Sequence, residues 1–163
     1  MADLQRIWAP WRLCYVQVPD KQEDGCFLCR AAATDDEKGA LVLWRTEHSV
    51  ALLNRFPYNN GHLLIAPRAH KGDLEELTEV EVADQMRLLK RCKAALRDAI
   101  HPHGFNVGMN AGLVAGAGVP GHAHWHIVPR WQGDANFMPV VASTKVIPQS
   151  LEALWSLLRG EEA

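Results

Sequence analysis

No hydrophobic stretch of the chain approaches the ~20 apolar residues that a membrane-spanning helix needs, and the N-terminal MADLQRIWAPWRLCYV mixes charges and proline into its apolar residues, unlike a signal peptide. A basic excess is also lacking, because 17 Lys and Arg stand against 19 Asp and Glu. The missing hydrophobic stretch argues against membrane association. The charge balance argues against a scaffold for long nucleic acid, which needs clustered positive charge. Four cysteines are too few for a disulfide framework, so we expect a cytoplasmic protein.

The chain is long enough for one domain with one hydrophobic core. It has 163 residues, of which 48% are hydrophobic and 22% are charged, values typical of globular proteins and unlike those of disordered ones. We therefore expect a single domain over residues 1–163. By composition, the N-terminal segment (about 1–25) and the C-terminal tail (about 151–163) look like appendages to this domain.

Five short segments rich in Val, Leu and Ile have the pattern of strands and are bounded by turn residues. They are residues 40–45, 48–54, 61–67, 105–110 and 122–129. Between the third and the fourth, Thr78 and Glu81 fit a capping box, apolar residues recur at steps of three or four, and Pro102 then ends the helix. This order predicts an α+β fold in which one long helix covers one face of an antiparallel sheet.

Glycine is concentrated before the last expected strand. Residues 104–121 hold six of the chain's 12 glycines and no charged side chain. Glycines at this density let backbone N–H groups approach an anion closely, as phosphate-binding loops do. A flexible connection between two strands explains the same composition, so the glycines alone leave both readings open.

Three histidines alternate with apolar residues directly after this region. Successive side chains of a strand point to opposite faces, so His122, His124 and His126 would share one face of the sheet. Imidazole is a common metal ligand, although consecutive same-face positions of a flat strand do not easily converge on one ion. A neutral imidazole can also attack phosphorus and form a covalent intermediate, and we favour this reading.

These histidines and their surroundings resemble the histidine triad (HIT) superfamily of nucleotide hydrolases and transferases. The similarity includes the triad with the Ile-Val-Pro-Arg that follows it, residues 52–62 (LLNRFPYNNGH), residues 102–108 (PHGFNVG) and positions between Trp131 and Pro148. It runs from Trp8 to about Leu151 and points to the bacterial branch that contains diadenosine tetraphosphate phosphorylases. The resemblance implies a homodimer whose sheets join into one, and an adenine nucleotide or dinucleoside polyphosphate as substrate.

The resemblance also implies roles for particular residues. His124 would be the nucleophile that attacks the α-phosphate and carries a nucleotidyl intermediate, and His126 would contact the phosphate and the leaving group. The other implied site residues are Asn54 at the ribose hydroxyls, His62 as an orienting residue behind the site, Asn110 at phosphate, and the backbone of Gly116, Ala117 and Gly118 as further donors. Many relatives have a Ser or Thr in this loop and the present chain has none, so inorganic phosphate and water both stay open as the second acceptor.

Two cysteines, Cys26 and Cys29, are separated by two residues. This spacing is typical of redox motifs and of zinc ligands, and two unrelated thiols also fit it. The βαβ order of a thioredoxin-like redox motif is absent. In some relatives such a pair is completed by a histidine after the third strand and by the first triad histidine, which are His70 and His122 here. The resemblance therefore implies a structural zinc with no open position for water, and no organic cofactor.

Several functions remain compatible with the sequence. We favour a nucleotidyl transferase or hydrolase that cleaves a dinucleoside polyphosphate such as diadenosine tetraphosphate through a covalent intermediate on His124. A hydrolase of nucleoside phosphoramidates or adenylated small molecules would use the same residues. A nucleotide-binding sensor would bind without turnover, and a zinc-stabilised interaction module would use the histidines only structurally.

Overall fold

The computed structural model of the protein describes residues 25–134 and 146–161. In chain order its elements are α2 (Phe27–Ala33), β1 (Val42–Arg45), β2 (Ser49–Leu53), β3 (Leu63–Pro67), the short 3-10 helix η1 (Leu74–Glu76), α3 (Glu79–Ile100), β4 (Gly104–Met109), β5 (Trp125–Arg130) and α5 (Leu151–Arg159). The expected N-terminal appendage up to residue 24 and the resemblance at Trp8 and over 135–145 lie outside the described residues.

The five strands form one antiparallel sheet in the order β1-β2-β3-β5-β4. The first three strands form the meander that the sequence predicts, and β5 inserts between β3 and β4. All residues of β2 and β3 are buried, because both faces of the sheet are covered there. The α+β fold with an antiparallel sheet and one long helix is thus confirmed.

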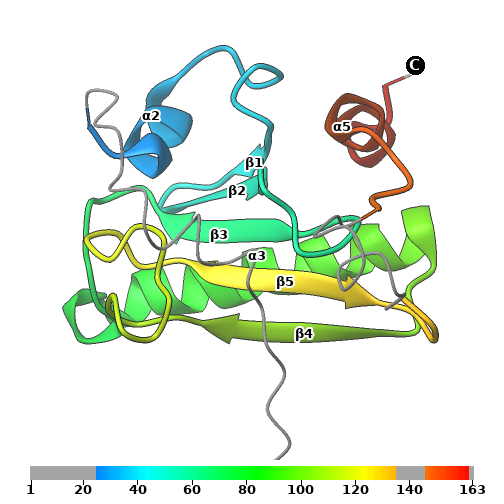
Figure 1. The fold of residues 1–163 in the computed structure, drawn as a ribbon. Coiled ribbons are helices and arrows are strands. Elements are labelled where there is room, and N and C mark those ends of the chain that lie inside the picture. Colours follow the sequence, from blue (N-terminus) through cyan, green and yellow to red (C-terminus); the bar gives the residue numbers. More distant parts are fainter. Residues whose placement is uncertain (1–24, 135–145, 162–163) are drawn as a thin grey trace, which may run out of the picture.

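Helices cover the two faces of the sheet differently (Figure 1). The long helix α3 lies along one face and buries Leu88, Cys92 and Leu96 in the main core, which also contains Ile127 of β5. On the opposite face, α2 packs over β2 and the β1 side, in a second core that includes Leu64 of β3. Across from Leu64 lies His126. Among the described helices, none covers this face over β5 and β4, and His126 lies there.

The start of α3 has the capping box that Thr78 and Glu81 predict, with both reciprocal hydrogen bonds present. The Glu81 carboxylate also accepts a hydrogen bond from Lys71 Nζ at 2.6 Å. The helix ends at Ile100, and its C-cap His101 takes a left-handed conformation just before Pro102. None of the helices in the described part of the chain has the length and apolarity that crossing a bilayer requires.

The C-terminal tail differs from the expectation of an appendage over 151–163. Its described part is the helix α5, capped by Ser150 at its start and by Gly160 in the left-handed region at its end. Leu154, Trp155 and Leu158 pack into the main core, and Trp155 Nε1 donates to Val42 O at 2.8 Å. The overall composition of the segment hides this amphipathic pattern, which places apolar residues along one side of the helix.

Candidate active site and metal site

The three histidines lie at the start of β5, but only His126 belongs to the strand. The structure begins β5 at Trp125, so the expectation that a strand over 122–129 carries all three histidines on one face is wrong. His122 and His124 lie in the preceding extended segment and are buried. This segment is held against the chain after β3, because Ala123 N–H donates to Lys71 O at 2.7 Å. The departure from strand geometry lets neighbouring histidines point to different surroundings.

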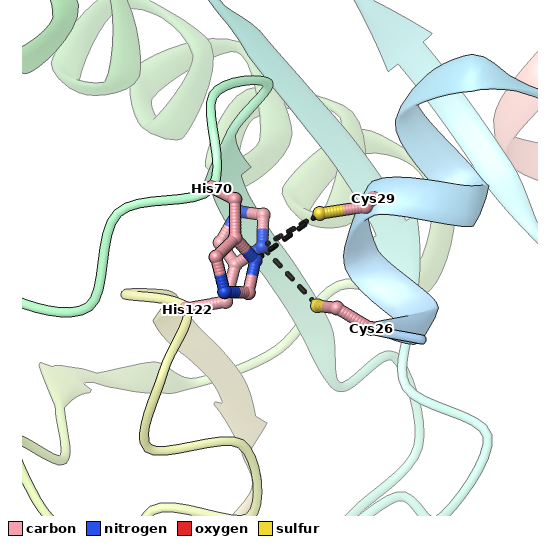
Figure 2. A group of neighbouring side chains, drawn as sticks. All are labelled: Cys26, Cys29, His70 and His122. Carbon is pink, nitrogen blue, oxygen red and sulfur yellow. Dashed lines mark hydrogen bonds between the residues drawn. The ribbon is translucent and has the colours of Figure 1, made fainter. Parts of the chain in front are cut away.

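His122 points toward α2, where it meets three other potential metal ligands (Figure 2). Its Nδ1 lies 3.2 Å from Cys26 Sγ and 3.4 Å from Cys29 Sγ, and His70 Nδ1 lies 3.3 Å from Cys29 Sγ. One ligand atom from each of the four residues lies within 4.8 Å of the others. Cys26 is the N-cap of α2 and Cys29 lies in its first turn, so the helix presents both sulfurs to the two imidazoles.

This cluster fits a tetrahedral zinc ion. Zinc–sulfur and zinc–nitrogen bond lengths imply ligand atoms about 3.3–3.8 Å apart, close to the separations present here. His122 Nε2 donates to Pro67 O at 2.8 Å, so the lone pair of the neutral ring is on Nδ1, toward the sulfurs. Such a second hydrogen bond to a backbone carbonyl is typical of metal-binding histidines. The four residues could therefore hold a metal ion.

His124 has the opposite arrangement of its ring nitrogens. Its Nδ1 lies 2.8 Å from the carbonyl oxygen of His122 and donates to it, which leaves the lone pair on Nε2. Burial lowers the pKa of His124, so the ring is neutral at pH 7. A neutral, oriented imidazole with a free lone pair on Nε2 is the form that attacks an electrophile.

His126 belongs to a chain of hydrogen bonds that starts at the turn between β2 and β3. Tyr58 N–H donates to His62 Nδ1 at 3.0 Å, so His62 carries its proton on Nε2. His62 Nε2 then donates to His126 Nδ1 at 2.9 Å. In the neutral ring, His126 therefore carries its own proton on Nε2 and is a donor there. The rings of His124 and His126 lie 5.0 Å apart, so a lone pair and a proton donor are neighbours.

Asn54 supports the same arrangement. Its Oδ1 accepts from Phe56 N–H at 2.9 Å, which turns its Nδ2 toward His62 Nδ1 at 3.2 Å. The amide donor at this distance is a second reason for His62 Nδ1 to remain without a proton. Asn54 thus lies beside the imidazole group, and His62 lies behind His126. The ribose contact and the orienting role that the resemblance implies for these two residues stay predictions.

The glycine-rich loop is internally hydrogen-bonded in this structure. Asn110 Nδ2 lies 3.4 Å from Gly116 O. The N–H groups of Gly116 and Ala117 donate to Leu113 O and Gly112 O, respectively. The resemblance implies that these N–H groups, together with that of Gly118, donate to a phosphate. A ligand would have to exchange these internal bonds for its own.

The sequence interpretation missed several groups that complete the site. The carbonyls of Pro67 and His122 and the N–H of Tyr58 fix the ring nitrogens, and they are backbone groups with no residue-type signal. Tyr58 also stacks on His126, with ring centroids 5.8 Å apart and planes 17° apart. Next to it is a cavity of about 260 Å³, lined by Tyr58, Asn59, Asn106, Val128 and Arg130. The sequence of residues 57–61 indicated a turn, but it gave no sign that Tyr58 would orient His62 and stack on His126.

Comparisons with known proteins show the family to which the chain belongs. The family described as HIT domain matches residues 35–133. An AP-4-A phosphorylase of Mycobacterium tuberculosis is 40% identical over 167 residues, covering 98% of this chain and 85% of that protein. An adenosine 5'-monophosphoramidase of Schizosaccharomyces pombe is 30% identical over 137 residues, covering 84% of this chain and 94% of that one.

A crystal structure of a zinc-bound histidine triad family protein from Mycobacterium smegmatis has the same fold. Its TM-score is 0.65 at 25% identity, covering 83% of this chain and 91% of that one. The chain belongs to the HIT domain family. It is an enzyme of that family.

Proposed function

We propose that this enzyme cleaves a dinucleoside polyphosphate such as diadenosine tetraphosphate at the α-phosphate, through a covalent nucleotidyl intermediate on His124. The observation that carries the proposal is the proximity of two rings with opposite tautomers. His124, with its lone pair on Nε2, and His126, with its proton on Nε2, have ring centroids 5.0 Å apart. The phosphorylase of M. tuberculosis, similar over nearly the whole chain, supports the choice of substrate.

In the first step, the lone pair of His124 Nε2 forms a bond to the α-phosphorus. The bond between this phosphorus and the bridging oxygen breaks, and its electron pair leaves with the nucleoside polyphosphate. His126 Nε2–H donates to the oxygen on which charge develops, and the hydrogen bond from His124 Nδ1 to His122 O stabilises the positive charge that the ring gains.

In the second step, an oxygen of the acceptor attacks the same phosphorus and the N–P bond breaks, which restores neutral His124. Inorganic phosphate as acceptor adds its phosphoryl group to the nucleotide. Water gives the nucleoside monophosphate and releases a proton. The loop from 115 to 121 has no hydroxyl side chain to distinguish the two acceptors, so both are tested below.

We also propose that Cys26, Cys29, His70 and His122 hold a structural zinc ion. With four protein ligands such an ion supplies no reactive water, only a rigid link between α2 and the segment before β5.

The described residues further support a homodimer, because the two outer strands differ. Trp155 and Arg159 of α5 donate to Val42 O and Leu43 O of β1, whereas none of the described elements lies along the outer edge of β4. A second copy would pair with β4.

The test is a single-turnover reaction with diadenosine tetraphosphate, with and without inorganic phosphate, in which chromatography identifies every product. ADP and ATP formed only with phosphate would establish a phosphorylase, and AMP and ATP would identify water as the acceptor. His124→Asn, which keeps a polar side chain but no nucleophile, is the control. Binding without turnover by the wild type would contradict the proposal.

A phosphoramidase is the second candidate, and the similarity to the S. pombe monophosphoramidase favours it. The same His124 attack would then expel an amine, which needs a proton from the site, and His126 Nε2 bears one. Comparing kcat/KM for adenosine 5'-phosphoramidate and diadenosine tetraphosphate decides between the two. The better substrate identifies the leaving group for which the site is built.

A further inference from the structure

Asn59 is a buried polar residue outside the histidine group, and its side chain joins the β2–β3 turn to the end of β5. It is 7% exposed. Its Nδ2 donates to Pro129 O at 3.0 Å and to Asp134 Oδ2 at 2.8 Å, so both amide hydrogens are used. The pairing between β3 and β5 ends at Leu63 and Ile127. Asn59 thus takes the place of a further strand residue opposite Pro129.

The acceptor Asp134 is held firmly in place. Arg130 donates to it through Nε and Nη2, at 2.5 and 2.8 Å, and Trp131 N–H adds a third hydrogen bond at 3.2 Å. Two parallel guanidinium hydrogen bonds fix a carboxylate in orientation as well as in position. Arg130 in turn donates through Nη1 to Asn106 of β4 at 2.8 Å. The Asn59 side chain is therefore attached to a rigid end of the sheet.

Asn59 is adjacent in sequence to the group that sets the proton positions. Tyr58 N–H is the donor to His62 Nδ1, and Asn59 O accepts from His62 N–H at 3.2 Å. The residues between 58 and 62 thus close around His62, and the Asn59 side chain ties this turn to β5. A shift of the turn would withdraw the Tyr58 donor and leave the Asn54 amide, 3.2 Å from His62 Nδ1, as the second donor to this nitrogen, so that the tautomers of His62 and His126 would be held less firmly.

We propose that Asn59, through its bonds to Pro129 O and Asp134, is a positioning residue that keeps the donor proton on His126 Nε2. The proposal rests on the function proposed above, because it assigns Asn59 to the step in which His126 donates to the leaving group. Asn59 acts through the Tyr58 peptide and His62, because both of its amide hydrogens are bound to Pro129 O and Asp134.

The neighbouring Asn60 provides a matched control. It has the same side chain and is 8% exposed, but its Nδ2 donates to Gln149 Oε1, at 3.3 Å, in the segment before α5. Losing either asparagine removes a buried amide from the same turn. Only the loss of Asn59 removes the link to β5 and Asp134.

The experiment compares Asn59→Ala and Asn60→Ala in the full chain. Long-range proton–nitrogen NMR spectra report which ring nitrogen of His62 and His126 carries the proton, and kinetics with diadenosine tetraphosphate give kcat and KM. We expect Asn59→Ala to mix the tautomers of both rings and to lower kcat about 10- to 100-fold with little change in KM, as loss of supporting hydrogen bonds does. Asn60→Ala should retain the wild-type tautomers and a kcat within about twofold.

Unchanged tautomers in Asn59→Ala, or the same change in Asn60→Ala, would overturn the proposal. Should Asn59→Ala fail to fold, Asp134→Asn replaces it, because it keeps the shape of the side chain and removes the charge that Asn59 and Arg130 bind. The NMR comparison needs no turnover. A wild type that cleaves no dinucleoside polyphosphate would therefore refute the proposed function while the role of Asn59 is still decided.

Discussion

The candidate metal site and the candidate reaction site both contain imidazoles, and the segment from His122 to His126 contributes to each. At the metal site, His122 donates from Nε2 to Pro67 O and turns its Nδ1 lone pair toward two sulfurs. At the reaction site, His124 donates from Nδ1 and keeps the lone pair on Nε2, whereas His126 accepts at Nδ1 and keeps a proton on Nε2. Three histidines at alternate positions thus have two tautomers, with the proton on Nε2 in His122 and His126 and on Nδ1 in His124.

The difference shows that the partner of the second nitrogen decides what each ring can do. A hydrogen bond to a backbone carbonyl leaves His122 with a lone pair for a metal ion and His124 with a lone pair for attack. A hydrogen bond from another imidazole, that of His62, leaves His126 with a proton to donate. The carbonyl of His122 itself orients His124, so the two sites share a peptide group. Each prediction below changes one side of this comparison.

The largest effect is expected from removing the nucleophile. His124→Asn should lower kcat about 10⁴-fold or more, because without the N–P bond only binding and polarisation remain. Metal content should stay as in the wild type, since the substitution leaves all four proposed zinc ligands, including His122, in place. His48→Asn, a substitution at a half-buried histidine outside both sites, should leave both quantities unchanged. Rapid-quench kinetics and metal analysis measure the two, and a His124→Asn enzyme with wild-type turnover would exclude the covalent route.

Removing a sulfur ligand should affect stability first. Cys29→Ser should lose the bound zinc and about 4 kcal/mol of unfolding free energy, the stabilisation expected at a free zinc concentration about 1,000 times Kd. Cys92→Ala is the control, because Cys92 lies in the main core and should not change zinc stoichiometry. Urea unfolding with zinc and with a chelator checks both. If the chelator leaves the wild-type midpoint unchanged, the zinc assignment is wrong.

A substitution at Asn54 tests whether this residue binds the substrate or only supports the imidazoles. If its amide contacts the ribose, Asn54→Ala should lower kcat/KM about 10- to 30-fold, the size of one buried hydrogen bond. A substrate with 2'-deoxyribose should then be a poor substrate of the wild type and no worse than the ribose form for the variant, as a double-mutant cycle requires. Equal sensitivity of both enzymes to the missing hydroxyl would leave Asn54 with only its bond to His62.

The fold could be predicted from the sequence better than the geometry of either candidate site. Strand patterns and the Thr78 capping box are local signals, and they gave the sheet and α3 correctly. Cys26, Cys29, His70 and His122, the candidate metal ligands that the resemblance implies, also lie together. The tautomers could not be predicted, because they depend on backbone groups such as Pro67 O that folding brings close from 55 residues away. The same holds for α5, whose contact with β1 joins residues 113 apart.

The peptide between the two sites is held from outside by Lys71, whose carbonyl accepts from Ala123 N–H and whose Nζ donates to Glu81. The hydrogen bond from Lys71 and that from Thr78 N–H lower the pKa of Glu81 from 4.5 to about 2. The folded state therefore binds this proton less readily than the unfolded state. The stabilisation by Glu81 is fully present above about pH 4.5 and is lost as the pH falls toward 2.

Glu81→Gln keeps the capping box, since glutamine also fits it, and removes only the charge. We expect it to lower the unfolding free energy by about 1 kcal/mol at pH 7, a value reduced by solvent screening, and we expect this loss to shrink as the pH falls from about 4.5 toward 2. Glu79→Gln, at an exposed position of the same helical turn, should change little at either pH. Denaturant unfolding between pH 7 and pH 2.5 gives the difference between each variant and the wild type. A difference for Glu81→Gln that does not shrink with falling pH would mean that the charge of Glu81 does not hold Lys71 against the segment between the metal site and the reaction site.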